Sequence, residues 1–372
     1  MRIAAGLTIP GLQGGIQVTE SNFIRAVSNC DDLKIVPFEF GGRSATEAVL
    51  RKVVARLADI GRFVVLLLRE KPDVVHLNSS YDKRALFRDV AYSVVSRLMG
   101  QALFIKFHGT DSKLLQDSSF VYSSLTRIVL AYSNRIGVLS REEKNNFINA
   151  GYNESKIDVV KNVVDMAEPS LAITRLEDPP LLLFIGRFIS TKGLLDVIKA
   201  LRFVRDRELN ANLVCVGDGP QRSEAERLVS DLGLEDAVEF TGHIPEHKAA
   251  DYYFRATILV FPTYHEEGFP MVVFQSLAAG LPIITTRIRA AADYLTDPEN
   301  CLWVEPKNPK QLGEKIMFLL RDQEMRRQMS VKNKGLAIKF SAQKVAKEYH
   351  TLYQDILEHL RNRKEVAQNG NK

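Results

Sequence analysis

The stretch "LLLFIGRFISTKGLLDV", residues 181–197, decides the fold class of this chain. A short apolar run, typical of a buried strand, leads through a loop into a helical pattern that Gly193 opens. The loop carries Arg187 and Lys192, so two cations lie beside the free N–H groups of a helix start, which suits phosphoryl oxygens. An ordinary exposed loop with two basic residues is the alternative.

The same alternation of strand and helix recurs along the chain and predicts an α/β protein with mostly parallel sheets. The expected strands are 2–7, 73–78, 102–107, 135–139 and 157–162, followed by 181–186, 212–217, 238–242, 258–262, 282–286 and 301–304. The expected helices of the first half lie near 16–29, 43–70, 82–99, 117–132 and 141–149. We therefore expect two Rossmann-like, doubly wound domains that face each other across a cleft.

Composition and periodicity also predict where these domains begin and end. Residues 1–165 form the first domain, a proline-rich linker covers 166–180, and residues 181–340 form the second domain. Residues 341–372 are expected to form a long amphipathic helix with a frayed tail. Ligands of such sheets bind at the carboxyl ends of the strands, so the loops that follow the strands are the place to look for a site.

The overall composition indicates a soluble globular protein of 372 residues, of which 45% are hydrophobic and 26% are charged. No apolar run approaches the roughly 20 residues that span a bilayer, and the first residues predict a strand rather than a signal peptide. Cys30, Cys215 and Cys301 are scattered without metal-ligand spacing, which predicts reduced thiols and a cytoplasmic location.

Positive charge concentrates in the predicted helix at residues 49–71. This segment holds six cations against two acids, a surplus of four in a chain whose net charge is +5. A solvated cationic face and docking on anionic lipids at the inner face of the cytoplasmic membrane are both compatible with this charge. Aromatic residues do not interleave with the cations, so no nucleic-acid surface is predicted.

Three further loops follow predicted strands and are candidate ligand contacts. "GDGPQR", residues 217–222, lacks the third glycine of a dinucleotide fingerprint and predicts a tight turn between strand and helix. "GLQGG", residues 11–15, places Gly14 and Gly15 before a helix, where either a bound phosphate or sugar or a loop with positive φ explains them. His108 stands at a strand end in "KFHGTD", and a structural or a functional role is open.

The sequence lacks the usual motifs of divalent-cation chemistry. There is no Asp-x-Asp pair at a strand end, and the five histidines after residue 240 lack metal-ligand spacing. A phosphate-loop sequence and a G-x-S-x-G nucleophile turn are absent as well. A diphosphate leaving group would therefore be stabilised by Arg187, Lys192 and helix dipoles, and neither a metal nor another cofactor is expected.

Four segments together resemble one family. "FIGRFISTKG", "VGDGP", "FTGHIP" and "EEGFPMVVFQSLAAGLPII" occur in the order and spacing of the retaining glycosyltransferases of family 4, the group 1 transferases. The resemblance is strong over residues 180–300 and looser at "GLQGG", "FHGTD" and the C-terminal helix. It implies the GT-B fold, with a C-terminal helix that crosses back to the first domain. It also implies metal-independent transfer of a sugar, with retention of configuration, from a nucleotide-sugar donor to a hydroxyl of a glycan or lipid-linked acceptor in polysaccharide, lipopolysaccharide or other glycan biosynthesis.

The same resemblance assigns roles to individual residues. It implies that Arg187 and Lys192 hold the donor diphosphate, that Glu267 binds hydroxyls of the transferred sugar, and that His108 closes the site from the acceptor-binding first domain. The other implied donor contacts are Gly14, Gly15, Gly242, His243, Ile244, Gly268, Phe269, Pro270, Met271 and Val272. The departing phosphate, rather than Glu267, is expected to accept the proton of the acceptor.

Two positions depart from the family pattern. Val163, in "NVVD", stands where the family usually has glycine, so the turn there is expected to differ. At the other position, the family has a second glutamate, separated from the first by seven residues. Here that position holds Gln275, which we expect to face the nucleoside end of the donor. Two other hypotheses stay open: a nucleotide-sugar 2-epimerase of the same architecture, and a binding or scaffold subunit without catalysis.

Overall fold

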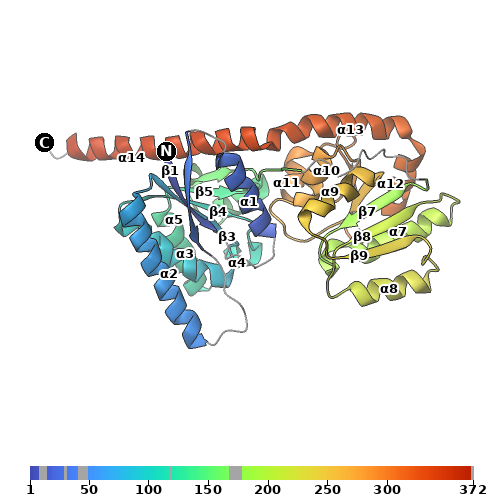
Figure 1. Cartoon of the computed structure of the whole chain (residues 1–372), viewed down its shortest axis with the longest axis horizontal. Coiled ribbons are helices and arrows are strands. Elements are labelled where there is room, and N and C mark those ends of the chain that lie inside the picture. The colour runs from blue at the N-terminus through green and yellow to red at the C-terminus, as the bar shows by residue number, and fades with distance from the viewer. Residues whose placement is uncertain (8–14, 29–31, 41–48, 117–118, 167–177, 370–372) are drawn as a thin grey trace. The chain divides into compact units, whose positions relative to one another are not determined.

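The computed structural model describes residues 1–7, 15–28, 32–40, 49–116, 119–166 and 178–369. It divides into two compact units. The first comprises Met1–Val163, Glu267–Phe269 and Phe340–Lys372, and the second comprises Val164–Glu266 and Pro270–Lys339. Each unit contains one six-stranded parallel sheet with helices on its faces, which confirms the predicted α/β class (Figure 1).

The sheet of the first unit has the strand order β2-β1-β3-β4-β5-β6. Its strands are β1 Arg2–Leu7, β2 Lys34–Glu39, β3 Val74–Ser79, β4 Ala102–Phe107, β5 Arg135–Val138 and β6 Ile157–Val159. Its helices are α1 Gly15–Ser28, α2 Val49–Glu70, α3 Lys83–Leu98, α4 Ser112–Gln116, α5 Phe120–Tyr132, α6 Arg141–Asn149, the 3-10 turn η1 Glu154–Lys156 and α14 Ala342–Asn369. The 3-10 turn η3 Ile338–Phe340 crosses the boundary of the units, which lies between Lys339 and Phe340. Right-handed crossovers place α1 on one face and α2, α3 and α5 on the other, because the strand order reverses at β1.

The C-terminal helix α14 covers the same face of this sheet as α1 (Figure 1). The hydroxyl of Tyr353 in α14 lies 2.7 Å from Nδ1 of His76 in β3. The ring of Tyr349 packs against Phe23 of α1 with a centroid distance of 4.7 Å. The helix thus braces the first unit, as the resemblance implied, and His76 is a core residue.

Strand β2 was not predicted from the sequence. Its segment "KIVPFE" contains Pro37, which has no N–H group to donate to a neighbouring strand. The strand lies at the edge of the sheet and pairs only with β1 in the described part of the chain, so half of its backbone needs no partner. By contrast, β3 and β4 are buried along their whole length and have the apolar character that made them recognisable.

The sheet of the second unit has the order β12-β11-β10-β7-β8-β9. Its strands are β7 Leu181–Ile185, β8 Asn212–Val216, β9 Val238–Gly242, β10 Ile258–Phe261, β11 Ile283–Thr285 and β12 Leu302–Trp303. Its helices are η2 Ser190–Lys192, α7 Leu194–Arg205, α8 Arg222–Asp231, α9 Glu246–Arg255, α10 Met271–Ala278, α11 Arg289–Tyr294, α12 Pro309–Arg321 and α13 Gln323–Ala337. The strand order reverses between β7 and β10, which are neighbours in the sheet although β8 and β9 separate them in sequence.

Candidate active site

The reversal between β7 and β10 is the natural place for a ligand in the second unit. In open α/β sheets, ligands bind at the carboxyl ends of the strands beside such a reversal, because the two following loops run to opposite faces and leave a crevice. The loop after β7 carries Arg187 and Lys192, and the loop after β10 leads to Glu267. The topology therefore brings these two sequence motifs to the same edge of one sheet.

The loop after β7 ends in the short turn η2 and Gly193. Gly193 has a φ of 80°, and a Cβ there would lie 2.9 Å from the carbonyl oxygen of Pro262. Glycine is thus required both by the backbone conformation and by the close approach of the neighbouring loop. Lys192 is only 3% exposed, and its Nζ lies 5.2 Å from the centroid of the Phe261 ring. Arg187 is exposed, so one buried and one exposed cation precede the start of α7.

Hydrogen bonds fasten the loop after β10 to the loop after β7. The backbone N–H of Tyr264 donates to the carbonyl of Thr191 at 2.8 Å, and its hydroxyl donates to the carbonyl of Ser190 at 2.8 Å. The Oγ1 of Thr191 lies 3.0 Å from Nδ1 of His265. The segment that leads to Glu267 is therefore held against the residues directly before Gly193.

Glu267 lies between this fastened segment and helix α10. The preceding residue, Glu266, accepts two hydrogen bonds from Arg289, one on its carbonyl and one on its carboxylate, each at 3.2 Å. Glu267 itself is partly exposed, and with Gly268 and Phe269 it groups with the first unit. Pro270 is the N-cap of α10, and Met271 and Val272 are its first two residues. The N–H of Val273 donates to the carbonyl of Pro270 at 2.9 Å.

Gln275 lies on α10 and has a protein partner. The hydroxyl of Tyr253, on α9, donates to Oε1 of Gln275 at 2.9 Å. Tyr253 is buried, and Gln275 is partly exposed. The amide oxygen is thus oriented by the protein, which makes the side-chain position well defined; its expected contact with the donor stays a prediction.

The loops after β8 and β9 complete this edge of the sheet. A Cβ on Gly217 would lie 2.0 Å from the carbonyl oxygen of Gly186, and a Cβ on Gly219 would lie 2.6 Å from that of Phe188. The glycines of "GDGPQR" therefore let two loops pass in contact, as the predicted tight turn requires, and need no dinucleotide to explain them. Gly217 also donates its N–H to the carbonyl of Gly242 at 2.9 Å. Beyond Gly242, with its φ of 73°, His243 is exposed and Ile244 partly exposed.

His108 follows β4 in the first unit and is held by two side chains. Asn78 donates through Nδ2 to the carbonyl of Gly6 at 3.0 Å, so its Oδ1 is the acceptor that lies 2.8 Å from Nε2 of His108. Nε2 therefore carries a proton, and Nδ1 faces Oγ1 of Thr19 at 3.4 Å. Burial and the charge of Lys106 hold the pKa of His108 well below 6.5. The ring is thus a neutral, oriented hydrogen-bonding group.

Two other expected contacts belong to the first unit. Gly14 lies outside the described residues, and Gly15 is the first residue of α1.

Of the residues that the structure describes, no group of three or more histidine, cysteine, aspartate or glutamate side chains could hold a metal ion. Within the same residues, no helix is long and apolar enough to cross a bilayer.

Comparison with known proteins identifies the family. Residues 39–168 match the model described as Glycosyltransferase Family 4, and residues 169–335 match the model described as Glycosyl transferases group 1. The two matches are contiguous and have the order of the two units. The chain belongs to the group 1 glycosyltransferases.

Individual relatives agree with this assignment. An uncharacterised glycosyltransferase of Methanocaldococcus jannaschii is 27% identical over 68% of this chain and 66% of its own length, so the chain spans about two thirds of that relative. The N-acetyl-alpha-D-glucosaminyl L-malate synthase of Bacillus anthracis is 23% identical over 83% of this chain and 81% of its own length. The structure of Anabaena Alr3699/HepE in complex with UDP covers 95% of this chain and 100% of its own, with a TM-score of 0.74 at 14% identity. This group 1 glycosyltransferase therefore has the GT-B fold.

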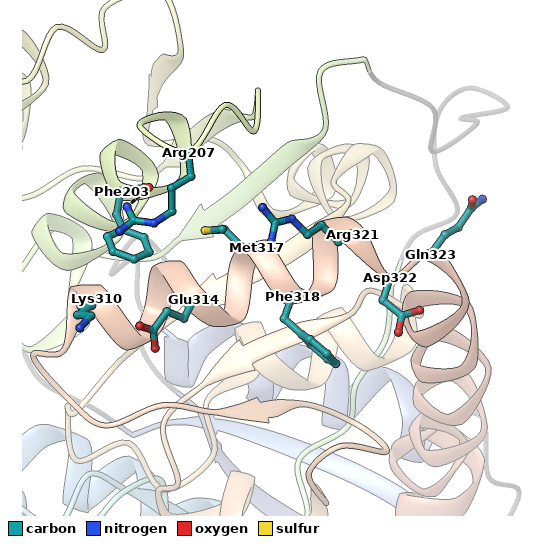
Figure 2. Close-up of a pocket in the computed structure, with 9 residues that line it drawn as sticks. All are labelled: Phe203, Arg207, Lys310, Glu314, Met317, Phe318, Arg321, Asp322 and Gln323. Carbon is teal, nitrogen blue, oxygen red and sulfur yellow. Dashed lines mark hydrogen bonds between the residues drawn. The ribbon is translucent and has the colours of Figure 1, made fainter.

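A hollow of about 720 Å³ in the second unit of this group 1 glycosyltransferase lies away from the strand ends (Figure 2). Its lining residues are Phe203, Arg207, Lys310, Glu314, Met317, Phe318, Arg321, Asp322 and Gln323. Phe203 lies in the last turn of α7 and Arg207 lies two residues beyond the end of this helix, which starts at the carboxyl edge of the sheet and runs back to the opposite edge. We assign this hollow no part in the reaction.

Sequence reasoning missed several residues that shape the candidate site. They are Thr191, Tyr253, Tyr264, His265 and Arg289. Each contacts a residue that is distant in sequence, as Arg289 does with Glu266, 23 positions earlier. The only signal available in the sequence was their position beside strand ends.

Proposed function

We propose that this glycosyltransferase transfers a sugar from a nucleotide-sugar donor to an acceptor hydroxyl, with retention of configuration and without a metal ion. The observation that carries the proposal is the buried Lys192 before α7, on a loop that is hydrogen-bonded to the segment leading to Glu267. A cation beside free helix N–H groups suits a diphosphate leaving group, because each charge-assisted bond contributes about 1.5–3 kcal/mol. The structurally similar Anabaena protein is in complex with UDP, which supports a nucleoside diphosphate as the ligand.

The proposed reaction uses the residues in distinct roles. Arg187 and Lys192 stabilise the negative charge that develops on the diphosphate as the bond from the sugar C1 to the phosphate oxygen breaks. Glu267 accepts hydrogen bonds from sugar hydroxyls and orients the sugar. A new bond forms from the acceptor oxygen to C1 on the same face, and the acceptor proton passes to the departing phosphate oxygen.

The remaining proposed contacts bind rather than react. The backbone of Gly268–Val272 approaches the sugar and phosphates, while Gly242–Ile244 and Gln275 of the second unit contact the nucleoside. In the first unit, His108, Gly14 and Gly15 are the proposed contributors. For His108, the fixed Nε2–H tautomer supports a hydrogen-bonding role rather than a proton-transfer role at neutral pH.

Calorimetric titration tests donor binding. We expect UDP, GDP or ADP to bind the full-length parent protein, and Lys192→Ala to bind the same nucleotide at least tenfold more weakly. NMR of the product formed from the matching nucleotide sugar then reports the anomeric configuration. A product of inverted configuration contradicts the proposed mechanism, and release of an epimerised nucleotide sugar would identify an epimerase instead.

We also propose that α2 holds the first unit on an anionic bilayer surface, where a lipid-linked acceptor would be presented. Val54, Leu57, Val65 and Leu68 are 45–64% exposed and lie on one face of α2, because they are spaced at 3, 11 and 14 residues from Val54. The exposed Arg62 and Arg69 are seven residues apart, so both lie along one flank of this apolar stripe by helical spacing. An apolar stripe with a cationic flank is the pattern of helices that lie in a membrane interface.

Vesicle co-sedimentation tests this attachment. The parent protein should pellet with phosphatidylglycerol vesicles more than with phosphatidylcholine vesicles, and salt should weaken the binding. The double variant Leu57→Ser and Leu68→Ser should lose most of it. Val331→Ser, which removes a side chain of α13 with 64% exposure, is the matched control and should bind as the parent does. Equal binding to both vesicle types, or binding to neither, contradicts the proposal.

A further inference from the structure

Arg289 has a backbone conformation that is unusual for its residue type. It is the first residue of α11 and has a φ of 38°, in the left-handed region where a Cβ is crowded by the following carbonyl. Only 2% of its side chain is exposed. Glycine would adopt this conformation without strain, so the strain at Arg289 points to a use for the side chain.

The guanidinium of Arg289 contacts both the backbone and the side chain of one residue. Its Nη1 donates to the carbonyl oxygen of Glu266 and its Nη2 donates to Oε2 of the same residue, each at 3.2 Å. The side chain of Glu266 is 50% exposed, so a buried cation is compensated by a carboxylate at the surface. Two parallel contacts to one residue restrict its rotation as well as its position. Glu266 immediately precedes Glu267.

The other fastenings of this segment act further from Glu267. Oγ1 of Thr286 donates to the carbonyl of Thr263, and Tyr264 and His265 contact the loop after β7. These bonds hold residues 263–265. Arg289 holds the next residue, Glu266, which is joined directly to Glu267 by a peptide bond.

We propose that Arg289 is a positioning residue: through Glu266 it holds Glu267 in the orientation in which Glu267 binds hydroxyls of the transferred sugar. The inference rests on the proposed function, in which Glu267 binds the sugar hydroxyls. Because Glu267 acts near the reacting carbon and the diphosphate is held by Arg187 and Lys192, a loss of positioning lowers kcat and leaves nucleotide affinity unchanged.

The principal test is Arg289→Gly, which keeps the backbone conformation and removes the guanidinium. We expect kcat to fall about 10- to 100-fold, the scale of a small misplacement of a reacting group. The donor KM and the Kd for UDP should stay within about twofold, and the melting temperature should change little, because relief of the strained backbone offsets the loss of the buried side chain. Arg289→Lys should recover part of the activity, because an ammonium group can still bond one oxygen of Glu266. Arg287→Gly, at an exposed arginine two residues earlier, is the matched control.

A double-mutant cycle separates this proposal from a general packing effect. Glu266→Ala removes the carboxylate and keeps the carbonyl contact, so its loss in kcat should be smaller and should not add to that of Arg289→Gly. If Arg289→Gly leaves kcat within twofold, or lowers kcat, UDP affinity and melting temperature together, the positioning role is wrong. Should Arg289→Gly fail to fold, Arg289→Lys and Glu266→Ala carry the same test through their kcat and KM values. Glu267→Ala is measured in parallel: an unchanged kcat there overturns the role of Glu267 itself, whatever Arg289 does.

Discussion

The two units each bury a lysine, and the two surroundings differ. Lys106 lies within β4, and its Nζ is 5.9 Å from the ring centroid of Phe23 in α1 and 5.5 Å from that of Tyr349 in α14. Lys192 lies on a loop at the carboxyl edge of the second sheet, above the ring of Phe261. Both side chains are at most 3% exposed, and an aromatic face partly compensates each charge. Burial therefore does not distinguish Lys192, the proposed diphosphate-binding residue, from the core residue Lys106. The two differ in position, because only Lys192 stands beside the strand-order reversal of its sheet.

The largest effect that would sharpen this comparison is expected from the second unit. Lys192→Ala or Arg187→Ala removes charge stabilisation of the leaving group and should lower kcat about 10²- to 10³-fold. Single-turnover kinetics with a saturating nucleotide sugar measures the loss. Lys199→Ala, at an exposed lysine of α7, should react as the parent does. Near-normal turnover of Lys192→Ala would show that this buried lysine does not stabilise the leaving group.

Lys106 of the first unit is instead expected to change the pH dependence of the free energy of unfolding. Burial lowers the pKa of Lys106 from 10.5 to about 7, against the opposing charge of Glu20. Between these values the unfolded chain binds one more proton than the folded chain, so stability rises with pH, by about 1.4 kcal/mol per unit. Urea unfolding of the parent and of Lys106→Met at pH 7 and pH 9 measures this difference. We expect the free energy of unfolding of the parent to rise relative to that of Lys106→Met between pH 7 and pH 9. A difference that stays constant with pH contradicts the loss of a proton from Lys106 in the folded chain.

A smaller effect is expected where a neutral side chain replaces the family's second glutamate. Gln275→Ala should raise the donor KM several-fold, because about 0.5–1.5 kcal/mol of hydrogen bonding is lost. Glu267→Ala should mainly lower kcat, and Gln275→Glu should stay within about tenfold of the parent. Tyr253→Phe removes the hydroxyl that orients Gln275 and should give a weaker version of the Gln275→Ala effect. An unchanged donor KM in Gln275→Ala would mean that the glutamine does not contact the nucleotide.

No effect at all is expected from removal of divalent cations. If Arg187, Lys192 and the α7 N-terminus stabilise the diphosphate, turnover should be the same in EDTA and in magnesium. Activity that is lost in EDTA and restored by magnesium or manganese would show that the two cations do not suffice.

The sequence by itself determined the alternation of strands and helices. The bounds of β1, β4 and β9 agree residue for residue with the predicted 2–7, 102–107 and 238–242. Parallel strands are covered on both faces, so they require continuous apolar runs that can be recognised without any knowledge of their neighbours. The same locality allowed the tight turn at "GDGPQR" and the loop motifs of the family to be recognised.

Only the tertiary structure decided which distant residues meet. Strand β2 depends on its place at a sheet edge, where Pro37 is tolerated. The bond between Tyr253 and Gln275 and the clamp of Arg289 on Glu266 join residues 22 and 23 positions apart. Local periodicity records whether a residue is buried, but the partner of a polar side chain depends on strand order and on the loops that order brings together, which no short stretch of sequence contains.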